Sequence, residues 1–467
     1  MAANDKQEEY SLSEFEEDDE DEGSYEEESF SEEDLETNGI KHLDSEKELN
    51  RLDTDDYGVK NAKFNENGQN IIDTDTSYVM QSPEMLLAKL RKDDDNYLEF
   101  ESLKVNRIKC LGLCKILFGQ RDWRTAEAHL QLGETYSKGK YYYQQCLKHA
   151  NLARDILLDV QNKGSNAVPT LELQNLLQNM YLLLGKTNYK IGKYKVSENC
   201  LLKAKLVSDK TQSDNIKFVL LRVSILSALG ETFSMLGNFG QSTEYIEEAI
   251  EIVHKMPSTY MHLCINLYKQ IVNIELMNEK HANLETAYDF ANKAVKVSIE
   301  VNGRECKETA QLFILSCKVE SLKEISNYEK IEKNIDEAME IYKTLKLPEN
   351  EIVALKMHCK ILMQQEKITD AKTTLDEAIL KSESVFGDCS LQTAELYDLM
   401  GSILFSQKKL PAALNFFLKA SEIYEGKRKC AEKREKLNRI IEIIRKSCKD
   451  DTIKTSDEKL KERPRFA

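Results

Sequence analysis

The side chains in this sequence that could do chemistry are mainly lysines and asparagines, which supply ammonium and amide donors for anions and peptide carbonyls. The seven histidines form no cluster with the spacing of metal ligands, and the eleven cysteines include no CxxC pair. There is no glycine-rich phosphate loop, no HExxH motif and no GxSxG motif. These observations predict that the protein is not an enzyme and holds no cofactor or metal, so its function should lie in binding.

Eight polar residues are predicted to line one surface where partner peptides bind, because they recur at fixed offsets from a series of small residues. They are Lys186, Lys190, Asn266, Lys269, Asn273, Lys318, Lys356 and Lys360. Eighteen such positions between 266 and 364 contain four lysines and no acid, whereas the two ends of the series contribute Glu127, Glu134, Glu395 and Asp398. The pattern predicts acidic or acidic–aromatic peptides as partners. Lysines that are merely solvated are the alternative interpretation.

A repeated stretch indicates the elements that must position these residues. Residues 116–140 and 384–408 both contain Phe-Gly, then Thr-Ala-Glu, then a glycine fourteen residues after the first one. Extending this register gives seven anchors, spaced by 52, 45, 42, 45, 42 and 42 residues: Gly133, Gly185, Gly230, Val272, Cys317, Cys359 and Gly401. Four repeats add a small residue twelve positions after the anchor and an alanine seven positions later.

Small residues on two antiparallel helices let the backbones approach, and large apolar residues fill the remaining seam. One such hairpin cannot bury its apolar face alone, so neighbouring hairpins must stack. The sequence predicts an all-α fold, a right-handed superhelical solenoid of tetratricopeptide-type hairpins with capping helices. Within it, Trp123 should begin the first helix of repeat one, and His129 should be a hydrogen-bonded packing residue.

Charge divides the chain into three predicted parts. Residues 1–82 form an acidic tail that cannot pack a core, since 1–40 hold 18 Asp and Glu against Lys6. Residues 83–447 form about seven repeats with capping helices, and 448–467 form a basic, disordered tail. The acidic tail is either solubilising or a set of acidic–aromatic motifs that bind a partner. The lysine-containing surface of the repeat domain in the same chain is one candidate partner.

The sequence gives no sign of secretion or of membrane insertion. The first 30 residues do not resemble a signal peptide, and no apolar run is expected to approach the roughly 20 residues that span a membrane. Scattered cysteines fit a reducing compartment. A cytoplasmic protein that binds neither nucleic acid nor membrane is predicted.

Two segments carry a family resemblance. RIKCLGLCKILFGQRDWRTAEAHLQLGETYSKGK with KHANLARDILL, and FGDCSLQTAELYDLMGSILFSQKKLPAALNFFLKA, are similar to the opening and the close of the tetratricopeptide repeat protein 23 and 23-like family. The resemblance covers about 84–425, and the 42-residue period resembles that of kinesin light chain. It implies a non-enzymatic scaffold at the cilium base or centrosome, linked to Hedgehog signalling. No binding residue is carried over from the family.

Two classes of function remain open at this point. The first is an interaction scaffold that holds partner peptides in the groove of the superhelix. The second is a microtubule- or motor-associated cargo adaptor, because residues 425–467 hold 15 Lys and Arg against 9 Asp and Glu and could meet an acidic tubulin surface.

Overall fold

The computed structural model describes residues 82–93, 99–139, 141–163, 168–211, 213–278, 282–425, 427 and 430–459. Side chains of the last helix are described as far as Lys446. Every regular element within these ranges is helical. In chain order the elements are α3 (Pro83–Asp93), α4 (Phe100–Phe118), α5 (Trp123–Lys138), α6 (Tyr143–Asn162), α7 (Thr170–Ile191), α8 (Tyr194–Lys210), α9 (Ile216–Met235), α10 (Phe239–Lys255), η3 (Ser258–Tyr260), α11 (His262–Met277), α12 (Leu284–Asn302), α13 (Lys307–Glu320), α14 (Tyr328–Thr344), α15 (Pro348–Gln364), α16 (Ile368–Phe386), α17 (Leu391–Ser406), α18 (Leu410–Tyr424) and α19 (Ala431–Lys459).

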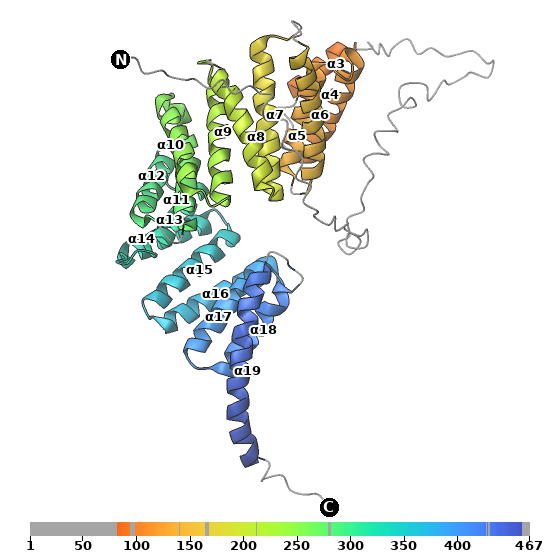
Figure 1. Cartoon of the computed structure of the whole chain (residues 1–467). Coiled ribbons are helices and arrows are strands. Elements are labelled where there is room, and N and C mark those ends of the chain that lie inside the picture. Colours follow the sequence, from red (N-terminus) through yellow and green to blue (C-terminus); the bar gives the residue numbers. More distant parts are fainter. Residues whose placement is uncertain are drawn as a thin grey trace, which may run out of the picture. The chain divides into compact units, whose positions relative to one another are not determined.

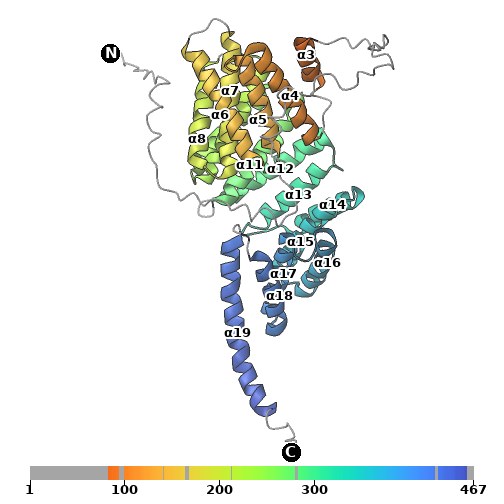
Figure 2. The ribbon, with the colours of Figure 1, turned by 90° about the vertical axis from the view of Figure 1, so that its right-hand side faces the viewer.

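The helices from α5 to α18 form seven consecutive hairpins, α5–α6 through α17–α18, in which the two helices of each pair pack along each other (Figure 1). Each second helix also packs on the first helix of the next hairpin. The turned view shows this for α16 beside α17 (Figure 2). First helices of neighbouring hairpins touch as well: α5 with α7, α7 with α9, α9 with α11, and α13 with α15. This stacking is that of a helical-repeat solenoid, and it confirms the predicted all-α fold.

The predicted anchors lie buried on the first helices, where each hairpin closes most tightly. A Cβ added at Gly401 would lie 2.6 Å from the ring of Phe417 on α18, which is 1% exposed. The same construction at Gly185 and Gly230 meets the paired helix at 2.5 and 2.3 Å. A large apolar side chain therefore occupies the space that each of these three glycines leaves. This is the packing predicted from small residues beside large apolar ones.

The repeated Phe-Gly…Thr-Ala-Glu motif builds the turn between hairpins. Its glycine ends a second helix with a positive φ of 82 to 89°, a conformation that residues with a Cβ rarely adopt. Its threonine, inside the next first helix, donates a hydroxyl hydrogen bond to the carbonyl of that glycine. The three pairs are Thr125 with Gly119 (2.7 Å), Thr309 with Gly303 (2.8 Å) and Thr393 with Gly387 (2.8 Å).

Within the described residues, four hairpins have a left-handed residue in their internal turn, seven positions after the anchor. Glycine supplies it after α7 and α9, at Gly192 and Gly237. After α15 and α17 the same position holds Glu366 and Lys408, both with a φ of 59°. Side chains with a Cβ are strained in this conformation, so these two repeats hold their turns at a cost.

The first helix begins where the sequence placed the start of the helical domain: α3 starts at Pro83 and packs on α4. At the other end, α19 packs on α18 through Leu437, Ile441 and Ile444 and then continues to Lys459. The helix thus extends beyond 447, where the sequence placed the start of a disordered tail. Residues 1–81 and 460–467 lie outside the described residues, so the acidic tail stays a prediction.

One helix departs from the expectation that no apolar run approaches a membrane-spanning length. Helix α9 is long and apolar enough by length and composition, and its apolar window is 56% buried. It packs between α8 and α10 as the first helix of the third hairpin, which explains why its sequence is apolar on nearly all sides. Burial within the solenoid therefore accounts for its composition.

Two residues singled out in the sequence have the packing roles predicted for them. Trp123 begins α5. His129 is 3% exposed, and its Nδ1 lies 2.9 Å from Nδ1 of His149 on α6. Burial, the neighbouring histidine and Lys115 lower the pKa of His129 to about 3, so the pair is held neutral.

Candidate functional site

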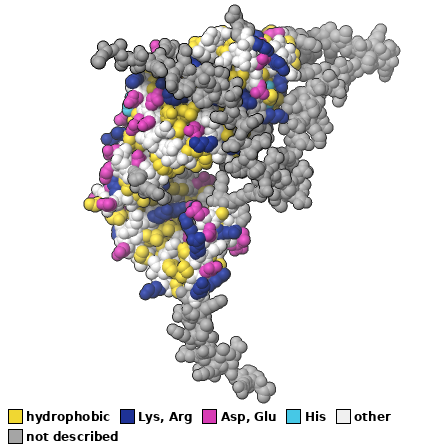
Figure 3. Space-filling view, viewed as in Figure 1, with side chains coloured by type: hydrophobic (Ala, Val, Ile, Leu, Met, Phe, Trp, Pro, Cys, Tyr) yellow, Lys and Arg dark blue, Asp and Glu magenta, His cyan; other side chains and the backbone are white. Residues whose placement is uncertain are grey.

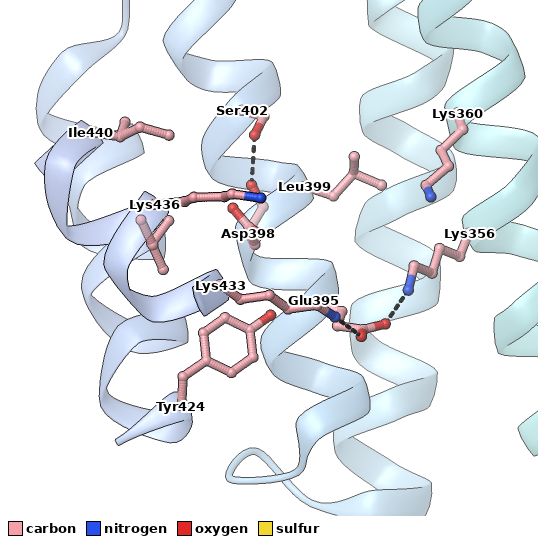
Figure 4. Close-up of a pocket in the computed structure, with 11 residues that line it drawn as sticks. Lys356, Lys360, Glu395, Asp398, Leu399, Ser402, Tyr424, Lys433, Lys436 and Ile440 are labelled. Atoms are coloured by element: carbon pink, nitrogen blue, oxygen red, sulfur yellow. Dashed lines mark hydrogen bonds and ion pairs between the residues drawn. The ribbon is translucent and has the colours of Figure 1, made fainter. Parts of the chain in front are cut away.

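The side chains that the sequence singled out meet most closely at a cavity of about 330 Å³ formed by α15, α17, α18 and α19. Figure 4 shows side chains from these helices converging on it. Lysine and arginine side chains gather over the same part of the molecule in Figure 3, beside apolar ones. The lining residues are Lys356, Lys360, Glu395, Asp398, Leu399, Ser402, Tyr424, Lys433, Lys436, Leu437 and Ile440.

Helical periodicity explains why these residues share one cavity. Residues three or four apart lie on the same side of an α-helix. Lys356 and Lys360 are such a pair on α15, and Asp398 and Ser402 repeat the spacing on α17. Helix α19 adds its own face. The sequence therefore sets which side chains point together from each helix, whereas stacking sets which helices face one another.

Glu395 links three helices at the edge of the cavity. Its carboxylate is paired with Lys356 of α15, and it also accepts a 2.7 Å bond from Lys433 of α19. Burial opposes ionisation, but the bonds and charges of the two lysines together hold the pKa of Glu395 below its usual value. The carboxylate is therefore ionised at neutral pH, and one acid is shared by two cations.

Lys360 has no comparable acid. Among the described residues it forms no ion pair, and its side chain still reaches solvent. The surrounding protein desolvates the ammonium and lowers its pKa, the positive charges of Lys356 and Lys318 act in the same direction, and Glu395 opposes them. The positive charges of Lys318 and Lys360, from neighbouring hairpins, thus act on each other with little negative charge nearby to offset them.

Two further polar groups in the cavity have unused hydrogen-bonding capacity. Tyr424 is 2% exposed, and its buried hydroxyl has no hydrogen-bond partner among the described residues. Figure 4 shows this hydroxyl pointing into the cavity. Burial raises the pKa of Asp398, although Lys433 and Lys356 pull it down. Asp398 is therefore a weaker counter-charge than Glu395.

A second cavity of about 320 Å³ adjoins the first, and Lys356 and Glu395 line both. Its remaining lining comes from the start of α13, from α15 and α17, and from the end of α16: Lys307, Glu349, Asn350, Ile352, Val353, Phe386, Gln392 and Leu396. Val353 is 53% exposed, so the wall here is partly apolar. The two cavities give charged and apolar subsites along the same first helices.

The N-terminal candidates lie in a different electrostatic environment. Desolvation lowers the pKa of Lys186, and the charges of Glu231 and Glu134 counteract it. Glu134, Lys186 and Glu231 each follow an anchor directly, on α5, α7 and α9. Their charges therefore alternate in sign from one hairpin to the next. Lys190 donates to the carbonyl oxygen of Ser137 at 2.8 Å. The candidate lysines at this end are matched by acids or carbonyls.

The central candidates occupy α11. Asn266 and Asn273 are exposed on it, and Lys269 is partly exposed. Backbone and Cys306 hydrogen bonds lower the pKa of Glu308 at the start of α13, and the positive charges of Lys307 and Lys269 add smaller contributions. The structure therefore brings Lys318, Lys356 and Lys360 together and leaves the other five candidates elsewhere. Peptide binding by the eight candidate residues stays a prediction.

Sequence analysis did not place several residues of the cavity. Tyr424 and the lysines of α19 were not among the eight candidates, because α19 lies outside the repeat register. Its apolar face, with Leu437 and Ile440, was predicted to cap the array. The alternation of that apolar face with Lys433 and Lys436 is the signal that could have suggested a second, charged face toward the groove.

The described residues fall short of the requirements of a metal site. No cluster of three or more His, Cys, Asp or Glu that could hold a metal ion occurs in the ranges given above. The cavity offers ammonium groups, a phenol and carboxylates on rigid helices. This arrangement is suited to recognising a charged group.

Comparison with known proteins identifies what the chain resembles. Mouse tetratricopeptide repeat protein 23-like is 25% identical over 346 residues, which cover 72% of this chain and 74% of the relative. Human tetratricopeptide repeat protein 23 is 20% identical over 325 residues, which cover 68% and 71%. The chain is similar to the tetratricopeptide repeat protein 23 and 23-like proteins. The resemblance predicted from the two end segments is thereby confirmed.

Solved structures support the tetratricopeptide-type fold. The crystal structure of the apo form of RapI is 12% identical, covers 79% of this chain and 98% of its own, and has a TM-score of 0.50. At that identity the likeness shows the fold alone. No family model matches the chain. Like other tetratricopeptide-type solenoids, this chain has a fold that supports protein–protein interaction.

Proposed function

We propose that the chain is a non-enzymatic scaffold that binds partner proteins through peptide segments held on the surface of its first helices. One observation carries this proposal. At the cavity of α15, α17 and α19, rigid stacked helices present lysines that the protein itself does not fully pair, next to partly apolar walls. Exposed charge beside apolar surface is what a peptide with acidic and hydrophobic side chains can use.

The test is capture of partners by the full-length chain and by a variant with Lys318→Glu and Lys360→Glu. Proximity labelling in cells compares the two, with Lys343→Glu as the matched control because Lys343 is exposed on α14 outside both cavities. We expect the double variant to lose a set of partners that the control retains. Identical partner sets for all three proteins would contradict the proposal.

The acidic segment 1–40 is the simplest peptide to examine first. It carries 18 acids against one lysine and contains interleaved aromatic residues. A tethered segment has a high effective concentration, so even a weak site on the same chain could be occupied by it. Binding of a labelled 1–40 peptide can be measured by fluorescence anisotropy. A dissociation constant weaker than about 1 mM at low salt would contradict the proposal that segment 1–40 binds this surface.

The cellular location that we propose is the cilium base or the centrosome. Only the resemblance to the tetratricopeptide repeat protein 23 family supports it. Microscopy of the tagged full-length chain, with markers for centrosomes and the ciliary base, tests it. Uniform cytoplasmic staining in ciliated cells would count against this location and leave the scaffold proposal standing.

A microtubule- or motor-associated adaptor is the second candidate. The observation in its favour is the basic C-terminal segment, together with the length of α19. Deleting residues 447–467 removes basic residues but keeps the apolar residues of α19 that pack on α18. Loss of microtubule co-sedimentation in this truncated chain would favour the adaptor. Equal sedimentation of both chains would argue against it.

A further inference from the structure

The cavity between α15, α17 and α19 has an unequal balance of charged groups. Four lysines line it, Lys356, Lys360, Lys433 and Lys436, against the carboxylates of Glu395 and Asp398. Glu395 is already shared by Lys356 and Lys433. Lys436 pairs along its own helix with Glu432 at 3.0 Å, on the exposed side of α19. This leaves Lys360 as the cation that faces the cavity without an acid among the described residues.

The unsatisfied phenol of Tyr424 provides a second and independent observation. Buried hydroxyl groups normally have a hydrogen-bond partner, because leaving one unpaired costs free energy. Tyr424 is almost completely buried, yet its hydroxyl has no described partner and faces the cavity (Figure 4). A phenol in this position can donate to an oxygen that enters the cavity from outside.

These two groups together favour an anion as the occupant. An incoming carboxylate would pair with Lys360 and offset its repulsion with Lys356 and Lys318, while the hydroxyl of Tyr424 can donate to another oxygen of the same peptide. A lysine or arginine side chain would have to approach four ammonium groups. Of the two acids that line the cavity, only Asp398 is not already paired with lysines, and desolvation disfavours the charged form of its carboxyl.

We propose that this cavity is a subsite for the carboxylate of an aspartate or glutamate in a bound peptide, paired with Lys360, and that Tyr424 donates to a second oxygen of that peptide. The inference rests on the proposed function, since it assigns one subsite of the peptide-binding surface. The adjoining cavity, with Val353 and Phe386, then takes the neighbouring apolar part of the same peptide. The Glu395 ion pairs fix the positions of α15 and α19 around the subsite.

The first experiment selects ligands without assuming their sequence. Random dodecapeptides displayed on phage are panned against the full-length chain, against Lys360→Glu and against Lys343→Glu. We expect the wild type and Lys343→Glu to enrich peptides with an acidic residue at one fixed position beside apolar residues. Lys360→Glu should lose that enrichment. Circular dichroism confirms that each variant keeps its helices.

The outcomes separate the two proposals. If no protein selects any peptide, both the proposed function and this inference fail. If peptides are selected without an acidic position, with a basic one, or with the same acidic position by Lys360→Glu, the inference fails while peptide binding stands.

The second experiment measures one selected peptide and its Glu→Gln or Asp→Asn version by anisotropy. On the wild type we expect the acidic peptide to bind about tenfold tighter, as for a charge-assisted bond that is partly screened. On Lys360→Met the difference should shrink to about twofold, since the charged partner is gone.

Tyr424→Phe separates a binding role of the hydroxyl from a purely structural one. Removing an unpaired buried hydroxyl should leave thermal stability unchanged or raised, because no hydrogen bond of the free protein is lost. Binding of the acidic peptide should nevertheless weaken about threefold, as expected for one lost hydrogen bond. Unchanged binding by Tyr424→Phe, or an equal loss for both peptides on Lys360→Met, would overturn the proposal.

Discussion

Replacing Gly401 by alanine is the sharpest test of how the hairpins close. The added Cβ would lie 2.6 Å from Cδ1 and Cε1 of Phe417 and 3.0 Å from its Cγ. Carbon atoms in contact prefer about 3.5–4.0 Å, so α17 and α18 would have to separate by about 1 Å or the ring would have to rotate. Phe417 is 1% exposed and has little room to rotate.

Two effects of opposite sign decide the magnitude. Overpacking a filled core costs about 1–3 kcal/mol. Alanine in place of glycine within a helix gains about 1 kcal/mol. We therefore expect Gly401→Ala to destabilise the α17–α18 hairpin by up to about 2 kcal/mol, or at least to lose the helical gain. Because a solenoid need not unfold in one step, hydrogen exchange of the α17 and α18 amides is the suitable measurement.

Gly112 on α4 is the matched control. It also lies within a helix, but a Cβ there meets no atom within 4 Å. Gly112→Ala should show only the helical gain, about 0.5–1 kcal/mol of added stability around α4. Adding Phe417→Leu to Gly401→Ala should recover part of the loss, because the ring is the obstacle. If Gly401→Ala stabilises α17 as much as Gly112→Ala stabilises α4, the account of the anchors is wrong.

Three other predictions concern the turns and the buried histidines. Thr393→Val removes the hydroxyl bond to the carbonyl of Gly387 and should lower the stability of the last hairpin by about 1–2 kcal/mol in urea unfolding, while an unchanged midpoint would refute the role of the motif. Lys408→Gly relieves a left-handed residue with a φ of 59° and should slow hydrogen exchange in the α17–α18 turn, with a gain of about 0.5–1 kcal/mol. Burial, mutual repulsion and Lys115 lower the pKa of His129 to about 3, and burial lowers that of His149 to about 4, so the unfolded chain binds more protons between these values and about 6.5. Stability should therefore fall as the pH is lowered from about 6.5 toward 4, and a flat profile from thermal unfolding over that range would contradict the buried neutral pair.

Repeat spacing made the hairpins predictable, since each anchor and each following alanine had to meet a partner helix. Gly185 with Leu201 and Gly401 with Phe417 are such meetings, and both are contacts between neighbouring helices of one hairpin. The C-terminal end was harder to predict. The start of α3 at Pro83 agrees with the predicted domain boundary, but α19 lies outside the repeat register, so no spacing indicated where it ends.

The candidate site was only partly predictable for a related reason. Position relative to the anchor placed Lys318 and Lys360 on one predicted surface, and in the structure the charge of Lys318 contributes to the lowered pKa of Lys360. It could not indicate that Lys356 is paired with Glu395, because the acid belongs to a different offset in the next repeat. Counting acids at equivalent positions therefore overstated the free positive charge.

The sequence by itself determined the local pattern, because helix period and side-chain volume act between residues close in the chain. It determined that small residues sit where helices cross and that glycine and threonine form the turns. The sequence predicted that α19 caps the array, but the tertiary structure alone decided that it brings Lys433 to Glu395 in the cavity that Tyr424 also lines. That arrangement depends on how the last hairpin is capped, since the unpaired phenol and lysine line one cavity only when separate helices are packed together.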